Sequence, residues 1–145
     1  MEYGMNLKLK SRKNLFMQLA FVLLTTMVMM GCRSNVLYQV PPIATPSGMG
    51  SDQVAKEIER TLIERNWMIV NSEPGLITSQ LNVRTHSLMI DINYDETNIK
   101  VKYKSSTNLR YSKDDDGTEY IHKKYTSWMK NIEKDLHKNL RLAQY

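Results

Sequence analysis

Cysteine, histidine and long apolar runs are all scarce in this chain of 145 residues. The single cysteine excludes an internal disulfide and a zinc site made of cysteines alone. The chain contains no Gly-x-Ser-x-Gly, His-Glu-x-x-His or glycine-rich phosphate-binding motif. Its longest largely apolar run has 16 residues, whereas a helix that spans a bilayer needs about 20. These absences argue against the commonest hydrolase and metalloenzyme sites and against a membrane-spanning helix.

The composition is that of one small globular domain. The chain is 41% apolar and 24% charged, which is close to the globular average and excludes wholesale disorder or a fibrous repeat. A length of 145 residues allows one domain and hardly more.

The first 31 residues differ from the rest and have the organisation of a secretory signal. A basic opening contains Lys8, Lys10, Arg12 and Lys13. The apolar run of residues 15–30 follows, and a small residue then ends the segment. This order of basic, apolar and small residues is typical of a cleaved signal peptide, and we assign it to residues 1–31. A transmembrane anchor is the alternative, for which the run is short.

The end of this segment resembles the lipobox of bacterial lipoproteins. The residues are Met29-Met30-Gly31-Cys32, with methionines where a leucine and a small residue are usual. The resemblance implies cleavage between Gly31 and Cys32, a diacylglycerol on the Cys32 thiol and an acyl chain on the new amine. Arg33 follows, where aspartate commonly favours retention in the inner membrane, so the resemblance implies the periplasmic face of the outer membrane. An ordinary cleaved signal that ends near a buried cysteine is the alternative.

Most of the basic excess lies in this signal. Residues 1–31 contain four Lys and Arg against one Glu, whereas the remaining residues contain 16 against 14 acidic residues. Lys100, Lys102 and Lys104 form a basic stripe without interleaved exposed aromatics, and we therefore expect no nucleic-acid partner. The stripe is consistent with a protected edge strand or with contact to an anionic envelope polymer or lipid head groups.

Residues 32–50 are predicted to form a flexible tether behind the lipidated cysteine. They contain three of the four prolines and no acidic residue, which favours extended, poorly packed chain. The alternative is that residues 36–38 pack on the domain or on a partner.

Residues 51–145 are predicted to form a single periplasmic α+β domain with two layers. Apolar residues at helical spacing predict a helix from 51 to about 65 and another from near 122 to about 142. Alternating residues predict an antiparallel sheet of about four strands, at 67–70, 76–84, 87–94 and 99–104. The order α-β-β-β-β-α places both helices on one face of the sheet. A polar loop is expected from 105 to about 120.

Two motifs follow the last predicted strand, Ser106-Thr107-Asn108-Leu109-Arg110-Tyr111 and Ile121-His122-Lys123-Lys124-Tyr125-Thr126-Ser127-Trp128. With them, residues 51–140 resemble a group of small uncharacterised bacterial envelope lipoproteins. The resemblance implies a lipid-anchored periplasmic α+β domain and brings no activity with it. The candidate binding residues are Asn108, Tyr111, His122, Tyr125 and Trp128. They either form a packing cluster or line a pocket of a periplasmic enzyme or carbohydrate-binding domain.

No catalytic residue and no metal site is predicted. His122 and His137 are fifteen residues apart on one predicted helix, more than about 20 Å, and cannot share a metal. An EF-hand alignment that begins at Ser112 fails at position twelve, where Lys123 replaces the required glutamate.

We therefore expect a non-catalytic binding or assembly module of the cell envelope, with no cofactor besides the lipid on Cys32. Its partners would be membrane lipid through that anchor and an envelope protein or polysaccharide.

Overall fold

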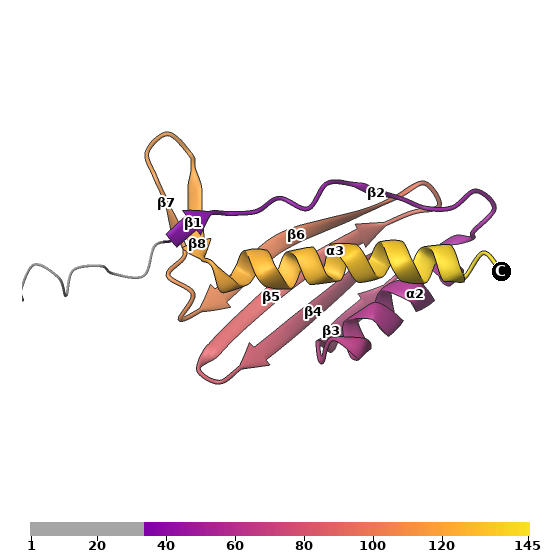
Figure 1. Ribbon diagram of the computed structural model, residues 1–145, viewed down its shortest axis with the longest axis horizontal. Coiled ribbons are helices and arrows are strands. Elements are labelled where there is room, and N and C mark those ends of the chain that lie inside the picture. The colour runs from indigo at the N-terminus through magenta and orange to yellow at the C-terminus, as the bar shows by residue number, and fades with distance from the viewer. Residues whose placement is uncertain (1–33) are drawn as a thin grey trace, which may run out of the picture. The chain divides into compact units, whose positions relative to one another are not determined.

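The computed structural model describes residues 34–145, which form eight strands and two helices (Figure 1). The signal peptide and the lipidation site predicted at Cys32 lie outside the described residues. In chain order the elements are β1 (Ser34–Val36), β2 (Ile43–Ala44), α2 (Ser51–Glu64), β3 (Met68–Glu73), β4 (Leu76–Val83), β5 (His86–Tyr94), β6 (Asn98–Thr107), β7 (Ser112–Lys113), β8 (Glu119–His122) and α3 (Lys124–Leu142).

The main sheet has the strand order β2-β6-β5-β4-β3, and every pair in it is antiparallel. The predicted meander of four strands is therefore confirmed as β3 to β6. Pro74 and Gly75 form the turn between β3 and β4, where Gly75 adopts a φ of +83° that glycine tolerates. Along β5 the alternate residues Leu88, Ile90 and Ile92 are fully buried, as their period of two predicts.

Both helices cover one face of this sheet and run antiparallel to each other (Figure 1). The order of their contacts shows the direction: Thr61 in α2 contacts Asn139, whereas Arg65, the residue directly after α2, contacts Asp135, which comes earlier in α3. Asn139 is fully buried and its amide donates to the Thr61 hydroxyl at 2.9 Å. The predicted two-layer α+β class is confirmed.

A second sheet forms from segments where no strand is predicted. Its order is β1-β8-β7, and both pairs are antiparallel. The expected polar loop from 105 to 120 is thus shorter than predicted, since β6 continues to Thr107 and β7 and β8 form a hairpin. These strands are short and contain polar residues, so they lack the alternation of apolar and polar residues from which a strand is predicted.

Residues 34–49 are not a flexible tether, and this prediction is wrong. β1 pairs with β8, placing Ser34 opposite His122, and β2 pairs with β6, placing Ile43 opposite Ile99. Apolar side chains are buried all along the segment: Leu37, Val40, Ile43 and Met49. Their burial outweighs the free-energy cost of ordering the chain, so the domain includes residues 34–49 and does not begin at residue 51. The alternative, packing of residues 36–38, holds for Leu37 and Tyr38, whereas Val36 is 60% exposed.

Among residues 34–145, the buried hydrophobic side chains form one core cluster that extends from Leu37 to Leu140 along the chain. Neither of the described helices is both long enough and apolar enough to cross a membrane.

Candidate functional site

The five candidate binding residues do not form one group. Asn108, Tyr111, His122 and Tyr125 lie at the end of the domain where β8 leads into α3. Trp128 instead lines a separate groove of about 540 Å³ together with Trp67 and Leu81.

Two histidines stack at this end of the domain. The rings of His86, on β5, and His122, on β8, lie 5.7 Å apart with an interplanar angle of 24°. His86 Nδ1 donates to the backbone oxygen of Asn108 at 2.9 Å, and the Asn108 amide donates to the backbone oxygen of Thr85 at 2.7 Å. Asn108 itself adopts a φ of +58°, which asparagine accepts more readily than most residues. It therefore ties the end of β6 to the turn between β4 and β5.

His122 connects this stack to the start of α3. Its Nδ1 accepts the backbone N–H of Lys124, the first residue of α3, at 3.2 Å. Burial lowers the pKa of His122, and the neighbouring charges of His86, Lys123 and Arg110 lower it further. An unprotonated Nδ1 is also what the bond from Lys124 requires. The neutral imidazole is thus part of the folded structure.

Acidification should destabilise the domain through His122. Because its folded-state pKa lies below the ordinary value of about 6.5, the unfolded chain binds the proton more tightly. The stabilisation from neutral His122 is complete above that ordinary value, and it is lost progressively as the pH falls toward the lowered pKa. The free energy of unfolding in urea, measured as the pH falls below about 6.5, should decrease less steeply in His122→Gln than in the parent. An equal slope in both would contradict the prediction; the exposed His137→Gln serves as the control.

Three tyrosines form a second cluster beside the histidines. Tyr103 stacks on Tyr111, with centroids 4.7 Å apart, and contacts Tyr125 edge to face at 6.1 Å. Tyr125 is 2% exposed, and burial raises its pKa far above the usual range. The Tyr111 hydroxyl donates to Glu119 at 2.7 Å, which raises the pKa of Tyr111. The tyrosines therefore pin the segment after β6 to the beginning of α3.

These contacts favour packing over a ligand pocket at the predicted site. Grooves on the surface of residues 34–145 include ones of about 600, 540 and 240 Å³. None of Asn108, Tyr111, His122 and Tyr125 lines any of the three.

The acidic residues after β7 belong to a hairpin turn. The Asp114 N–H donates to the Thr118 oxygen, the Gly117 N–H donates to the Asp114 oxygen, and Asp116 accepts the Thr118 N–H at 2.8 Å. Gly117 has a φ of +88°, as a tight turn requires. Within residues 34–145, no group of three or more His, Cys, Asp or Glu side chains is placed to hold a metal ion.

The structure shows one surface feature that the sequence analysis missed. Lys130, Lys134, Lys138 and Arg141 are exposed on successive turns of α3, and we call these four residues the basic face. Their spacing of four, four and three places them on one side of the helix. The spacing of these four cations can be read from the sequence, where they alternate with the apolar stripe of the same helix.

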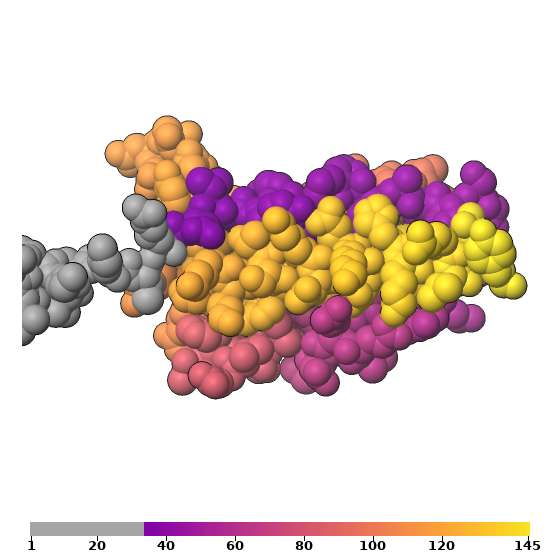
Figure 2. Space-filling view, viewed as in Figure 1, coloured from indigo at the N-terminus to yellow at the C-terminus, as the bar shows by residue number. Residues whose placement is uncertain are grey.

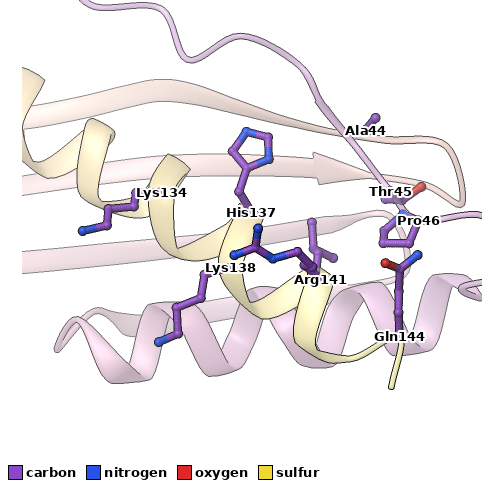
Figure 3. A pocket seen from close by; sticks show the side chains of 9 residues that line it. Ala44, Thr45, Pro46, Lys134, His137, Lys138, Arg141 and Gln144 are labelled. Carbon is purple, nitrogen blue, oxygen red and sulfur yellow. The ribbon is translucent and has the colours of Figure 1, made fainter.

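A groove of about 600 Å³ runs beside the basic face (Figure 3). Three residues of the basic face line it together with His137, and Thr45 and Pro46 lie across from them. The segment after β2, which was expected to be a flexible tether, therefore forms one wall of the groove.

A scan of protein-family models and searches of curated proteins and of solved structures found no match to this chain.

Proposed function

We propose that this chain is a lipid-anchored protein of the bacterial cell envelope, with a domain that serves as a non-catalytic binding or assembly module. The observation that carries the proposal is the order of the N-terminal segment. Four basic residues precede a 16-residue apolar run, and Gly31-Cys32 follows directly. In this proposal Cys32 becomes the first residue of the mature protein, on the periplasmic face of the outer membrane.

The anchor would hold the protein firmly. Each buried methylene contributes about 0.8 kcal/mol, and stable attachment takes more than one lipid signal. A diacylglycerol together with an amide-linked acyl chain meets that requirement. The position of the folded part supports this arrangement, because β1 begins only two residues after Cys32.

Two features of residues 34–145 support the proposal of a non-catalytic binding module. The histidines and tyrosines with the most specific contacts hold the chain together, and the open surface of α3 carries cations. Such a surface suits recognition of an anionic partner.

Fatty-acid labelling tests the proposal. Cells that express the chain should incorporate radiolabelled palmitate into it, and Cys32→Ser should abolish both the label and the membrane association. A matched control combines Cys32→Ser with Ser47→Cys, which restores a thiol away from the lipobox and should stay unlabelled. Label that persists after Cys32→Ser would show that lipidation at this residue is not the anchor.

A further inference from the structure

We propose that the basic face of α3 lies along a bilayer surface that contains anionic phospholipids, so that the anchored domain rests on its side. The inference rests on the proposed lipid anchor, and it adds the orientation of the domain and the chemistry of the lipid it recognises.

The charges of the domain are balanced in number but separated in space. Residues 34–145 contain 15 Lys and Arg and 14 Asp and Glu. Of the two carboxylates on α3, Glu133 accepts the Tyr38 hydroxyl at 2.7 Å, and Asp135 is buried against Arg65. No exposed residue of α3 is therefore acidic, and the basic face forms no ion pair within the described part of the chain.

The basic face is open along the helix. Figure 2 shows α3 at the surface, between the segment of residues 34–50 and α2, with neither of them covering its outer side. The helix of 19 residues is about 28 Å long, so its cations can contact several lipid head groups at once. The neighbouring groove, with His137 and Arg141 in its lining, gives a head-group phosphate room beside the helix (Figure 3).

The covalent chain places the start of α3 near the membrane. Only Arg33 lies between Cys32 and Ser34, so these two residues are at most about 7 Å apart, two steps of about 3.5 Å each in extended chain. Ser34 pairs with His122, and α3 begins two residues later. An anchor at Cys32 therefore holds this end of α3 close to the head groups.

Charge then decides which side of the anchored domain faces the lipid. Surface potentials fade within a Debye length, about 8 Å at physiological salt. The far cations, Lys138 and Arg141, feel an anionic surface only if the helix lies along it. Each cation near such a surface strengthens association roughly fivefold, so a domain that lies flat gains most.

Lysine reactivity in vesicles tests this orientation. The lipidated protein is reconstituted into phosphatidylcholine vesicles with or without phosphatidylglycerol and treated with an amine-reactive reagent. Phosphatidylglycerol should slow the modification of Lys130, Lys134 and Lys138 roughly fivefold, and raised salt should reverse the effect. Lys100 and Lys102, exposed on the opposite face of the sheet, are the internal controls and should react equally in both vesicles.

Other patterns of protection would overturn the inference. Protection of Lys124 without Lys138 would mean that the domain stands upright on the anchor. Protection of Lys100 and Lys102 would mean that the sheet faces the lipid. Protection without phosphatidylglycerol would show that anionic lipid is not what the helix recognises.

Charge-reversal variants separate this inference from the anchor itself. Lys134→Glu with Lys138→Glu should restore the reactivity of Lys130, whereas the matched pair Lys100→Glu with Lys102→Glu should not. If the protein fails to enter vesicles, the lipid anchor is wrong. The Cys32→Ser protein, which has no lipid, then tests the helix alone. It should sediment with phosphatidylglycerol vesicles at low salt and less at raised salt. Adding Lys134→Glu and Lys138→Glu to this protein should abolish the sedimentation. Equal sedimentation of all variants would reject the basic face.

Discussion

Replacing Ile43 with alanine should lower the free energy of unfolding of the domain by about 2–5 kcal/mol. Ile43 is 1% exposed and lies in β2, where it pairs with Ile99 of β6. The substitution removes buried methyl and methylene groups and leaves a cavity between this segment and the rest of the core. Urea denaturation followed by circular dichroism measures the change.

A substitution at an exposed position of the same segment is the matched control. Val36 is 60% exposed, and Val36→Thr keeps a β-branched side chain, so stability should change by no more than about 0.5 kcal/mol. If Ile43→Ala were equally neutral, residues 34–49 would be the loose tether that their prolines suggest. That result would also mean that the proposed lipid anchor is not held close to the domain surface.

Replacing Tyr125 with alanine should cost about 3–5 kcal/mol, the range for truncation of a large buried aromatic side chain. Tyr125 is 2% exposed and its ring contacts Tyr103 edge to face. Its loss opens a cavity where α3, β6 and the segment after β6 meet. The midpoint of thermal or urea unfolding should fall accordingly.

Two milder variants distinguish packing from ligand binding at this end of the domain. Tyr125→Phe keeps the ring contacts and should cost much less than the alanine variant. Tyr111 is 39% exposed, and Tyr111→Ala should leave the domain folded at a cost of about 1 kcal/mol. If Tyr125→Ala proved as stable as the parent, the cluster would not be the packing element described above.

Because residues 34–49 pack on the domain, the proposed lipid anchor would be attached close to the folded part of the chain. A long tether would let the domain move freely above the bilayer and would make its surface charge irrelevant to its orientation. In the proposed lipoprotein only Arg33 would lie between the lipidated Cys32 and β1, so the charges on the domain surface would affect its orientation on the bilayer.

The spacing of apolar residues was sufficient to predict those helices and strands that bury one face. The stripe of Val54, Ile58 and Leu62 predicted α2, and the alternation from Leu88 to Ile92 predicted β5. Each period repeats within a single element, so it can be recognised without knowing which distant residues the element contacts.

The candidate site was predicted less well. Asn108, Tyr111, His122 and Tyr125 do come to one end of the domain, because β8 leads directly into α3. Trp128 does not lie with them and instead lines the groove of about 540 Å³ together with Trp67. The stacking of His86 on His122 was not predicted either. It depends on the pairing of β5 with β6 and on the hydrogen bond from His86 to the Asn108 oxygen, which are contacts between distant residues.

The sequence by itself therefore determined the fold class, the meander and the two helices, because these depend on hydrophobic periods within single elements. It is also the sole basis for the predicted export signal and lipid site, which are patterns of composition rather than of folding. Only the tertiary structure decided that residues 34–49 belong to the domain and that β1, β7 and β8 form a second sheet. Such short segments gain their hydrogen bonds and burial from partners far away in the chain. The same holds for the two carboxylates of α3, which are bonded to distant partners: Glu133 to Tyr38 and the buried Asp135 to Arg65.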